Sequence, residues 1–396
     1  MGPSPSEGAA MPEPVETMVA EILRLVRCES PSDDLAAVAR SADAVAELGT
    51  TRLGAAPERI VIDGRTHLRW RFDGAPRILV LGHHDTVWPV GSLDELPARA
   101  DDETLAGPGS FDMKAGLVIA FHALSRLTDL AGITVLVTGD EEPGSATSRA
   151  LIEDEARASI AALVLEAAGP DGALKIARKG VSRYEIAVHG RASHAGLDPE
   201  RGVNATLELA HQVQAVALLG DAAAGTTVTP TRTSSGTTTN TVPALASFSV
   251  DVRALSAAEQ ERVHAGMLAL SPRIDGARVV VDGGVNRSPL AADSSAELFR
   301  RAQRVADRLA LPPLTGISVG GASDGNFTAG VGTPTLDGLG AVGGGAHAAH
   351  EHVLIAELEP RVRLLAGLID DLRAAPPAPP APAAPSTRAP ISSTAR

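Results

Sequence analysis

Apolar positions along the chain follow two alternating patterns, one typical of amphipathic helices and the other of buried strands. Residues 15–26 and 32–48 carry apolar side chains at helical spacing, and Ser32 and Asp33 are candidate caps of the second helix. Short continuous apolar runs, which predict strands buried on both faces, lie at 77–82, 133–137 and 161–165. Because strands and helices alternate, the sequence predicts a mixed-sheet α/β fold.

From residue 180 the pattern changes to alternating polar and apolar positions, as in the stretch 183–189. The elements that follow have the order strand-helix-strand-strand-helix-strand, which is ferredoxin-like. We therefore expect an inserted ferredoxin-like α+β domain within a larger catalytic domain. The expected organisation is a loose leader at 1–14, catalytic segments at 15–179 and 289–373, the inserted domain at 180–288, and a disordered Pro/Ala-rich tail at 374–396.

The composition of the chain argues against some binding partners and indicates a cellular compartment. The formal net charge of −13 argues against nucleic acid and anionic membrane surfaces. No apolar run reaches about 18 residues, so no membrane helix is expected. Cys28 is the single cysteine and cannot form an internal disulfide. Together with a leader that lacks a signal-peptide pattern, these features predict a cytoplasmic protein.

Carboxylates and histidines follow the predicted strands, where ligands commonly collect in open α/β sheets. Glu141 and Glu142 are adjacent after one strand, and such a pair repels itself unless a cation is nearby. Glu166 follows another strand. His83 and Asp85 alternate onto one face of an extended stretch, so Asp85 can accept the second ring N–H of His83. Each segment alone is also compatible with an ordinary surface loop.

Two further segments contain candidate metal ligands, an aspartate and a histidine. Asp112 opens a helix after the tight turn at 107–109, where it is a candidate ligand or only a helix cap. His347 lies in a glycine-rich and histidine-rich stretch. His350 and His352 follow it closely and leave an alternative ligand assignment open.

Taken together, these segments predict a dinuclear metal site with two imidazoles and three carboxylates. This donor set favours divalent zinc, with cobalt or manganese as alternatives. One carboxylate must bridge, because two cations about 3.5–4 Å apart need a shared anion. Glu141 then remains as a general base that moves a proton from water to a leaving nitrogen. The candidate ligands are His83, Asp112, Glu142, Glu166 and His347.

The motifs resemble those of the co-catalytic zinc aminoacylase/carboxypeptidase family, which includes acetylornithine deacetylase, succinyl-diaminopimelate desuccinylase and glutamate carboxypeptidase. The resemblance extends over residues 15–372. The segments that carry it are 83–87, 107–116, 140–145, 192–196, 240–243, 251–253, 320–324 and 347–353. It implies a zinc-peptidase-like catalytic domain and a dimerisation or lid role for the inserted domain.

The resemblance also implies roles for single residues. Asp112 resembles the bridging aspartate, and the peptide bond after it is expected to be cis. His83 and Glu166 resemble the ligands of one metal ion. Glu142 and His347 resemble the ligands of the other. Glu141 resembles the general base, and Asp85 resembles the residue that orients His83.

In the inserted domain, His194 resembles a histidine that reaches into the partner subunit's site and stabilises the oxyanion. Asn240, Arg253 and Arg287 resemble residues that bind the carboxylate of the substrate. These resemblances imply a homodimer that closes over its substrate.

The expected function is metal-dependent cleavage of an amide bond that releases a C-terminal amino acid, as in glutamate carboxypeptidase. The expected substrate is a small N-acyl amino acid or peptide with a free carboxylate. The alternative within the same family is an N-acyl-amino-acid deacylase of acetylornithine-deacetylase type in a biosynthetic pathway. Two other classes compete: a non-catalytic binding subunit, and a hydrolase that uses a single metal ion.

Overall fold

The computed structural model describes residues 15–75 and 77–376. The predicted leader at 1–14, and the part of the predicted tail from residue 377 onward, lie outside the described residues. The chain divides into two compact units. The first unit comprises Met1–Leu174, Glu297–Thr315 and Val331–Arg396, and the second comprises Lys175–Ala296 and Gly316–Gly330. The predicted boundaries of the inserted domain stay a prediction.

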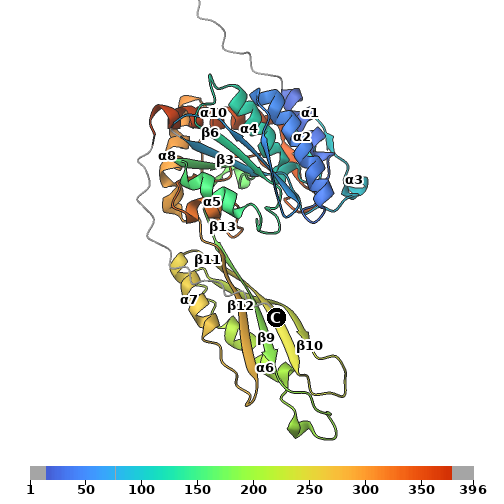
Figure 1. The fold of residues 1–396 in the computed structure, drawn as a ribbon. Helices are drawn as coiled ribbons and strands as arrows, with labels where there is room; N and C mark the ends of the chain where they lie inside the picture. Colours follow the sequence, from blue (N-terminus) through green and yellow to red (C-terminus); the bar gives the residue numbers. More distant parts are fainter. Residues whose placement is uncertain (1–14, 76, 377–396) are drawn as a thin grey trace, which may run out of the picture. The chain divides into compact units, whose positions relative to one another are not determined.

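The first unit is built on a mixed six-stranded sheet with the order β1-β2-β6-β3-β7-β14 (Figure 1). Its strands are β1 (Glu58–Ile62), β2 (Arg65–Arg71), β3 (Ile78–His83), β6 (Ile133–Thr138), β7 (Ala161–Val164) and β14 (Thr335–Leu336). The neighbours β6, β3, β7 and β14 are parallel, whereas β2 pairs antiparallel with β1 and β6. All residues of β3, β6 and β7 are buried, which explains their continuous apolar sequences. The predicted mixed α/β fold is confirmed.

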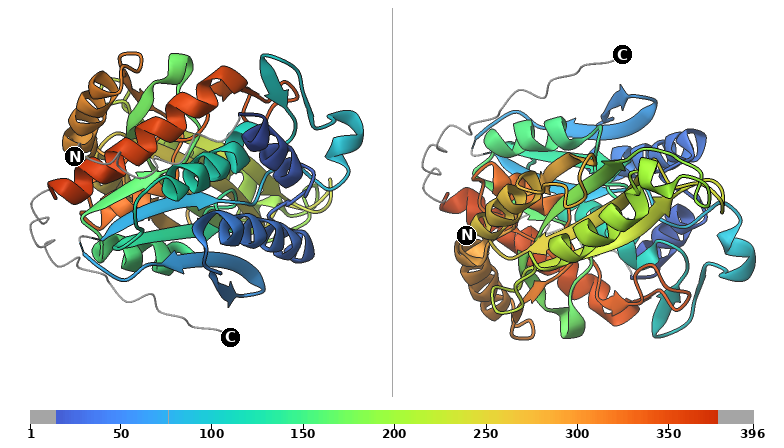
Figure 2. Two further views of the ribbon diagram at one scale, coloured as in Figure 1. Left: turned by 90° about the horizontal axis from the view of Figure 1, so that it is seen from above. Right: turned by 90° about the horizontal axis from the view of Figure 1, so that it is seen from below.

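Helices cover both faces of this sheet (Figure 2). On one face, α4 (Ala115–Ser125) contacts α1 (Val15–Val26), α2 (Leu35–Leu53) and α10 (Leu358–Ala374). The helix α5 (Arg149–Arg157) lies on the opposite face, and α8 (Ala292–Arg308) leads from the second unit into the first. Because α4 is enclosed by helices and sheet, its residues from Ala115 to Leu124 are all buried.

The start of α2 differs from the prediction. Asp34, not Ser32 or Asp33, accepts hydrogen bonds from two backbone N–H groups of the first turn, at 3.0 and 2.9 Å. The Ser32 hydroxyl instead donates to Asp85 Oδ2 at 2.6 Å. Any of these three residue types can cap a helix, so the sequence pattern alone could not distinguish them.

A smaller sheet in the first unit, with the order β15-β16-β5-β4, brings distant loops together. Its strands are β4 (Arg99–Ala100), β5 (Thr104–Ala106), β15 (Gly343–Gly344) and β16 (His352–Leu354). Because β16 pairs antiparallel with β5, the loop at 345–351 lies beside the turn that follows β5. Short helical elements of this unit are α3 (Ser92–Glu95), η1 (Ser110–Lys114), η2 (Pro170–Gly172) and η4 (Ile355–Glu357).

The second unit contains a four-stranded antiparallel sheet with the order β10-β11-β9-β12. Along the chain its elements are β9 (Gly180–His189), α6 (Ala205–Ala217), β10 (Thr227–Ser235), β11 (Leu245–Ala254), α7 (Ala257–Leu268) and β12 (Arg278–Arg287). This is the predicted element order. Both helices pack on one face of the sheet, around a core that includes Phe248, Val263 and Met267. The remaining elements are β8 (Leu174–Arg178), η3 (Pro199–Arg201), β13 (Gly316–Val319) and α9 (Gly325–Gly330).

Within residues 15–75 and 77–376, no helix is both long enough and apolar enough to cross a lipid bilayer.

Candidate metal centre

The parallel strands of the main sheet bring three predicted site residues to one edge. His83 is the last residue of β3 and lies in register with Thr138, the last residue of β6. Glu142 follows β6, and Glu166 follows β7, the other neighbour of β3. His83 Nε2 lies 3.7 Å from Glu166 Oε1. The edge is the carboxyl end of these strands, the usual place for ligand sites in open α/β sheets.

Asp112 lies between the two predicted histidine ligands. Its Oδ1 is 3.3 Å from His83 Nε2, and its Oδ2 is 3.3 Å from His347 Nε2. His347 Nε2 is also 3.3 Å from Glu142 Oε2. Each oxygen of Asp112 therefore faces a different imidazole, an arrangement that suits a carboxylate shared by two cations. The peptide bond between Asp112 and Met113 is cis, as the resemblance implied.

Asp85 is fully buried and connects the histidine segment to the glutamate pair. Its two carboxylate oxygens accept the backbone N–H groups of Glu141 and Glu142, at 3.1 and 3.2 Å. Its Oδ1 lies 3.4 Å from His83 Nδ1, and its own carbonyl lies 3.0 Å from the same nitrogen. These acceptors suit a proton on Nδ1, which leaves Nε2 directed at the cluster.

Charges within the cluster shift the affinity of its members for protons. Burial alone would lower the pKa of His83, but hydrogen bonds with Asp112 and Asp85 raise it well above its ordinary value. Hydrogen bonds with Asp112 and Glu142 raise the pKa of His347 to about 10. Burial raises the pKa of Glu142, against the opposing effect of His347. Protons on these imidazoles occupy the lone pairs that a metal ion would use.

The cluster fits divalent metal ions. Ligand atoms of His83, Asp112 and Glu142 all lie within 4.8 Å of one another, and so do those of His83, Glu141 and Glu166. Within the described part of the chain, the buried Oε1 of Glu142 has no hydrogen-bond partner. Buried carboxylate oxygens are costly without a donor or a cation, so this atom is consistent with a metal ligand. Imidazole nitrogens and carboxylate oxygens are the donors that zinc and similar ions prefer.

Of the histidines in this loop region, His347 makes the contacts with the carboxylates of the cluster. His352 lies in β16, and its Nδ1 is 2.9 Å from the carbonyl oxygen of His350. His347, in contrast, lies in the loop before β16 and has φ of 60°. This backbone conformation brings its ring to Asp112 and Glu142. The contacts favour His347 as the ligand of this loop.

Two residues near the cluster were not assigned a site role from the sequence. Ser32 supports Asp85, as described above, and Glu351 accepts hydrogen bonds from the turn that carries Asp112. Both are buried. Glu351 lies within the segment 347–353 that carries the family resemblance, as an acid in an otherwise small and histidine-rich loop. Nothing in that pattern distinguishes it from a surface charge.

His194 belongs to the second unit. It is exposed, and its Nδ1 accepts the backbone N–H groups of Gly196 and Leu197, both at 3.1 Å. The proton of a neutral ring must then be on Nε2, which makes that atom a hydrogen-bond donor. The carbonyl of Asn240 accepts the N–H of Ala195, so Asn240 lies close to His194 in the same turn region.

Two predicted substrate-binding arginines in the second unit pair with acids in the same unit. Arg253 bonds Asp251 through two contacts, at 2.7 and 3.1 Å. Arg287 is buried, lies 3.4 Å from Asp324, and places its guanidinium 4.8 Å from the centre of the Phe327 ring.

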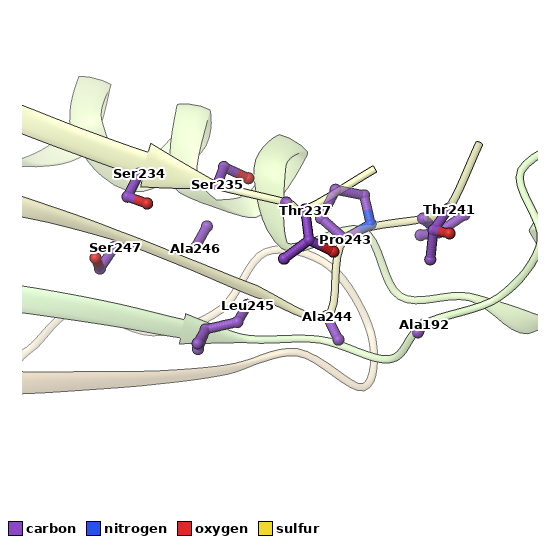
Figure 3. A pocket seen from close by; sticks show the side chains of 12 residues that line it. Ala192, Ser234, Ser235, Thr237, Thr241, Pro243, Ala244, Leu245, Ala246 and Ser247 are labelled. Carbon is purple, nitrogen blue, oxygen red and sulfur yellow. The ribbon is translucent and has the colours of Figure 1, made fainter. Parts of the chain in front are cut away.

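A cavity of about 300 Å³ lies in the second unit beside β10 and the loop before β11. Figure 3 shows that small side chains line it, among them Ser234, Ser235, Thr237 and Ser247. Its lining contains no titratable side chain of the described residues. Because catalysis requires groups that bind metal or move protons, the carboxylate–imidazole cluster, and not this cavity, is the candidate site.

The mixed sheet and the cluster at its carboxyl edge define the class of metallopeptidase-type hydrolases. A family model described as "Peptidase family M20/M25/M40" matches residues 79–371, and the chain belongs to this family. The family that the sequence motifs indicated is therefore confirmed.

Individual relatives are similar over most of their length. The chain is 31% identical to carboxypeptidase G2 of Pseudomonas sp. (strain RS-16) over 319 residues, which cover 76% of this chain and 75% of the relative. It is 30% identical over 337 residues to a succinyl-diaminopimelate desuccinylase of Cereibacter sphaeroides, covering 76% of this chain and 85% of the relative. A solved Bacillus subtilis structure, YXEP, described as a dinuclear metal-binding peptidase from the M20 family, shares the fold. Its TM-score is 0.63 at 14% identity, covering 91% of this chain and 98% of that one.

Proposed function

We propose that this chain is a dinuclear metal-dependent hydrolase that cleaves an amide bond and releases a C-terminal amino acid, as a glutamate carboxypeptidase does. The observation that carries the proposal is the position of Asp112, with one oxygen facing His83 and the other facing His347. The similarity to carboxypeptidase G2 supports the choice of reaction.

The proposed ligands form two sets around Asp112. His83 and Glu166 would hold one ion, Glu142 and His347 would hold the second, and Asp112 would bridge them. Zinc suits this set of nitrogen and oxygen donors, and cobalt or manganese are alternatives. The similarity in fold to YXEP, a dinuclear metal-binding peptidase of the M20 family, supports two ions. When bound, such ions supply Lewis acidity, which polarises the amide carbonyl and makes water a better nucleophile.

Glu141 is the proposed general base. Its backbone N–H is held by Asp85, and its carboxylate lies in one cluster with His83 and Glu166. From this position it would take a proton from the attacking water as oxygen adds to the acyl carbon. It would then give that proton to the leaving nitrogen as the carbon–nitrogen bond breaks. Asp85 would keep both Glu141 and His83 in place during this transfer.

The second unit supplies the proposed contacts to the rest of the substrate. His194 has a proton on Nε2 and would donate a hydrogen bond to the developing oxyanion of the partner subunit's site. Asn240, Arg253 and Arg287 would bind the free carboxylate of the substrate, because guanidinium groups match carboxylates in shape and charge. This scheme requires a homodimer in which the second unit acts as a lid.

The first test is Glu141→Gln. The substitution removes the proton acceptor but keeps the size of the side chain, so we expect the purified variant to retain two metal ions per chain. Its kcat should fall by about 10²–10⁴-fold, the usual contribution of a general base. Metal content by elemental analysis and steady-state kinetics would be measured on the same preparation.

The matched control is Glu153→Gln, which removes a carboxylate of α5 that pairs with Arg149 and Arg157. This variant should keep wild-type kcat. Activity of Glu141→Gln near the wild-type level would refute the assigned base. Full activity with one tightly bound ion would favour a mononuclear hydrolase, and wild-type protein without bound metal would favour a non-catalytic binding protein.

An N-acyl-amino-acid deacylase is the second candidate function, supported by the similarity to succinyl-diaminopimelate desuccinylase. The two candidates differ in which side of the amide bond is recognised. A panel of peptides with C-terminal glutamate and of N-acetyl and N-succinyl amino acids separates them. We expect the highest kcat/KM on the C-terminal glutamate substrates; higher values across the N-acyl series, irrespective of the amino acid, would favour the deacylase.

A further inference from the structure

Glu351 is a buried carboxylate that connects the two loops carrying Asp112 and His347. It is 3% exposed and stands between β15 and β16, in the same loop as His347. Its side chain accepts four hydrogen bonds. The donors are the backbone N–H groups of Gly109 (2.9 Å), Phe111 (2.9 Å) and Asp112 (3.0 Å), and Trp88 Nε1–H (2.8 Å).

The arrangement of these four donors suits a carboxylate side chain at position 351, because a carboxylate has only acceptor atoms. Oε1 accepts from Phe111 and Asp112, and Oε2 accepts from Gly109 and Trp88. A carboxylate offers about four acceptor positions, so all of them are used. A glutamine would present an N–H₂ group to two of these donors. Because its lone pairs are already occupied, Glu351 is not a candidate metal ligand.

The backbone around Asp112 needs such an anchor. The turn contains Gly109 at φ 71°, and Asp112 has non-helical φ and ψ of −116° and 93° within η1. The direction of the Asp112 side chain therefore depends on a backbone conformation that is not helical. The hydrogen bond from its N–H to Glu351 fixes the peptide plane directly before its Cα, and so limits where the carboxylate points.

We propose that Glu351 is a positioning residue of the metal centre. It holds the turn at 109–112 against the His347 loop, so that one Asp112 oxygen faces His83 and the other faces His347. A second link supports the same geometry, since the N–H of Gly107 donates to the carbonyl of Glu351 at 3.4 Å. The inference rests on the proposed function, because it concerns how this chain holds metal ions.

The experiment compares Co²⁺ binding by wild-type protein and by Glu351→Gln. Affinity is measured by competition with a chromophoric chelator, and the visible absorption spectrum of the bound cobalt reports its coordination. Loss of a residue that orients a ligand typically lowers metal affinity about 10–100-fold, and we expect a loss in that range together with a changed spectrum.

The matched control is Glu155→Gln. Glu155 is also 3% exposed and pairs with Arg69 at 2.8 Å, but it lies on α5 and has no role in the proposed site. Thermal unfolding of the metal-free proteins compares their stabilities. The control should be destabilised while its cobalt affinity and spectrum remain those of the wild type.

The outcomes separate this inference from the proposed function. Wild-type protein that binds no Co²⁺ overturns both. Two ions bound by the wild type, with equal affinity and an equal spectrum in Glu351→Gln, overturn the inference alone. An equal loss of affinity in Glu155→Gln would also overturn it, because the effect would then be general instability.

If Glu351→Gln does not fold, Trp88→Phe decides the question. This variant keeps Glu351 and an aromatic ring but removes one of the four donors. We expect a loss of cobalt affinity below the range of about 10–100-fold that follows loss of the whole orienting residue, together with a shifted spectrum. Affinity and spectrum identical to the wild type would overturn the proposal.

Discussion

Buried acids and histidines of the first unit bind backbone N–H groups as well as one another. Asp85 accepts the N–H groups of Glu141 and Glu142, and Glu351 accepts that of Asp112. His67 accepts the N–H of Gly139, just before the glutamate pair. These contacts hold the loops at the strand ends, which have no regular secondary structure of their own. The donors in these hydrogen bonds are backbone N–H groups, so the residue types in the sequence do not predict these contacts.

The buried imidazole of His67 predicts that the stability of the protein depends on pH. Its Nδ1 accepts the N–H of Gly139 at 3.2 Å, so Nε2 bears the proton and contacts the Thr147 hydroxyl at 3.0 Å. Burial lowers the pKa of His67 below 6.5, against the opposing charges of Asp140 and Asp85. The unfolded chain therefore binds this proton more readily than the folded protein. The contribution to stability is present above pH 6.5 and is lost as the pH falls toward the lower, folded-state pKa.

The measurement is urea unfolding of metal-free protein at about pH 7.5 and 5.5, on either side of the unperturbed histidine pKa. We expect the free energy of unfolding to fall more steeply over this interval in the wild type than in His67→Asn. The asparagine keeps an acceptor near Gly139 but does not titrate. Equal pH dependence in the two proteins would contradict a neutral His67 in the folded state.

At the scale of elements, the site depends on how closely α4 and the loop after β14 approach the end of β7. A Cβ atom on Gly116 would lie 2.3 Å from the carbonyl oxygen of Leu165, and one on Gly340 would lie 2.2 Å from the same atom. Leu165 directly precedes Glu166. Glycine at both positions therefore lets the backbone that carries Glu166 pass between two segments. The strands themselves could be predicted, because β3, β6 and β7 are buried on both faces and consist of apolar residues.

Gly116→Ala tests this close approach. In an exposed helix the change would stabilise by about 1 kcal/mol, because alanine is the better helix former. Here we expect a net destabilisation of about 1–3 kcal/mol, because the added methyl group would clash with the carbonyl oxygen of Leu165, a backbone atom that cannot adopt another rotamer. The control is Gly220→Ala, where the nearest atom lies 3.4 Å from the new Cβ; it should change stability by less than about 0.5 kcal/mol. Urea unfolding of both variants gives the sign, and a Gly116→Ala protein more stable than the wild type would contradict the argument.

For the whole molecule, the proposed ligands come from four separate segments between residues 83 and 166 and from a fifth near residue 347. Metal ions would therefore link segments that are far apart in the chain, and they would favour the folded state over the unfolded one. At a free metal concentration of about 100 times Kd, one ion contributes about 2.7 kcal/mol to the free energy of unfolding.

We therefore expect a chelator to lower the midpoint of thermal unfolding, and readdition of Zn²⁺ or Co²⁺ to restore it. Differential scanning calorimetry with and without chelator measures the change. Chelator already saturated with the same metal is the control for nonspecific effects. An unchanged midpoint after complete removal of metal would count against a site formed by these ligands.

The sequence by itself determined the buried strands β3, β6 and β7, the mixed α/β class, the family and the candidate ligand types, because strand burial and ligand chemistry both require particular residue types at particular spacings. It did not determine the cap of α2, which histidine of the loop before β16 contacts Asp112 and Glu142, or the contacts of Ser32, His67 and Glu351. These features were decided by the tertiary structure, because they depend on which backbone groups of distant loops meet. A backbone N–H is present in nearly every residue type, so the sequence does not indicate which residues donate to Asp85 and Glu351. The folded structure identifies these donors.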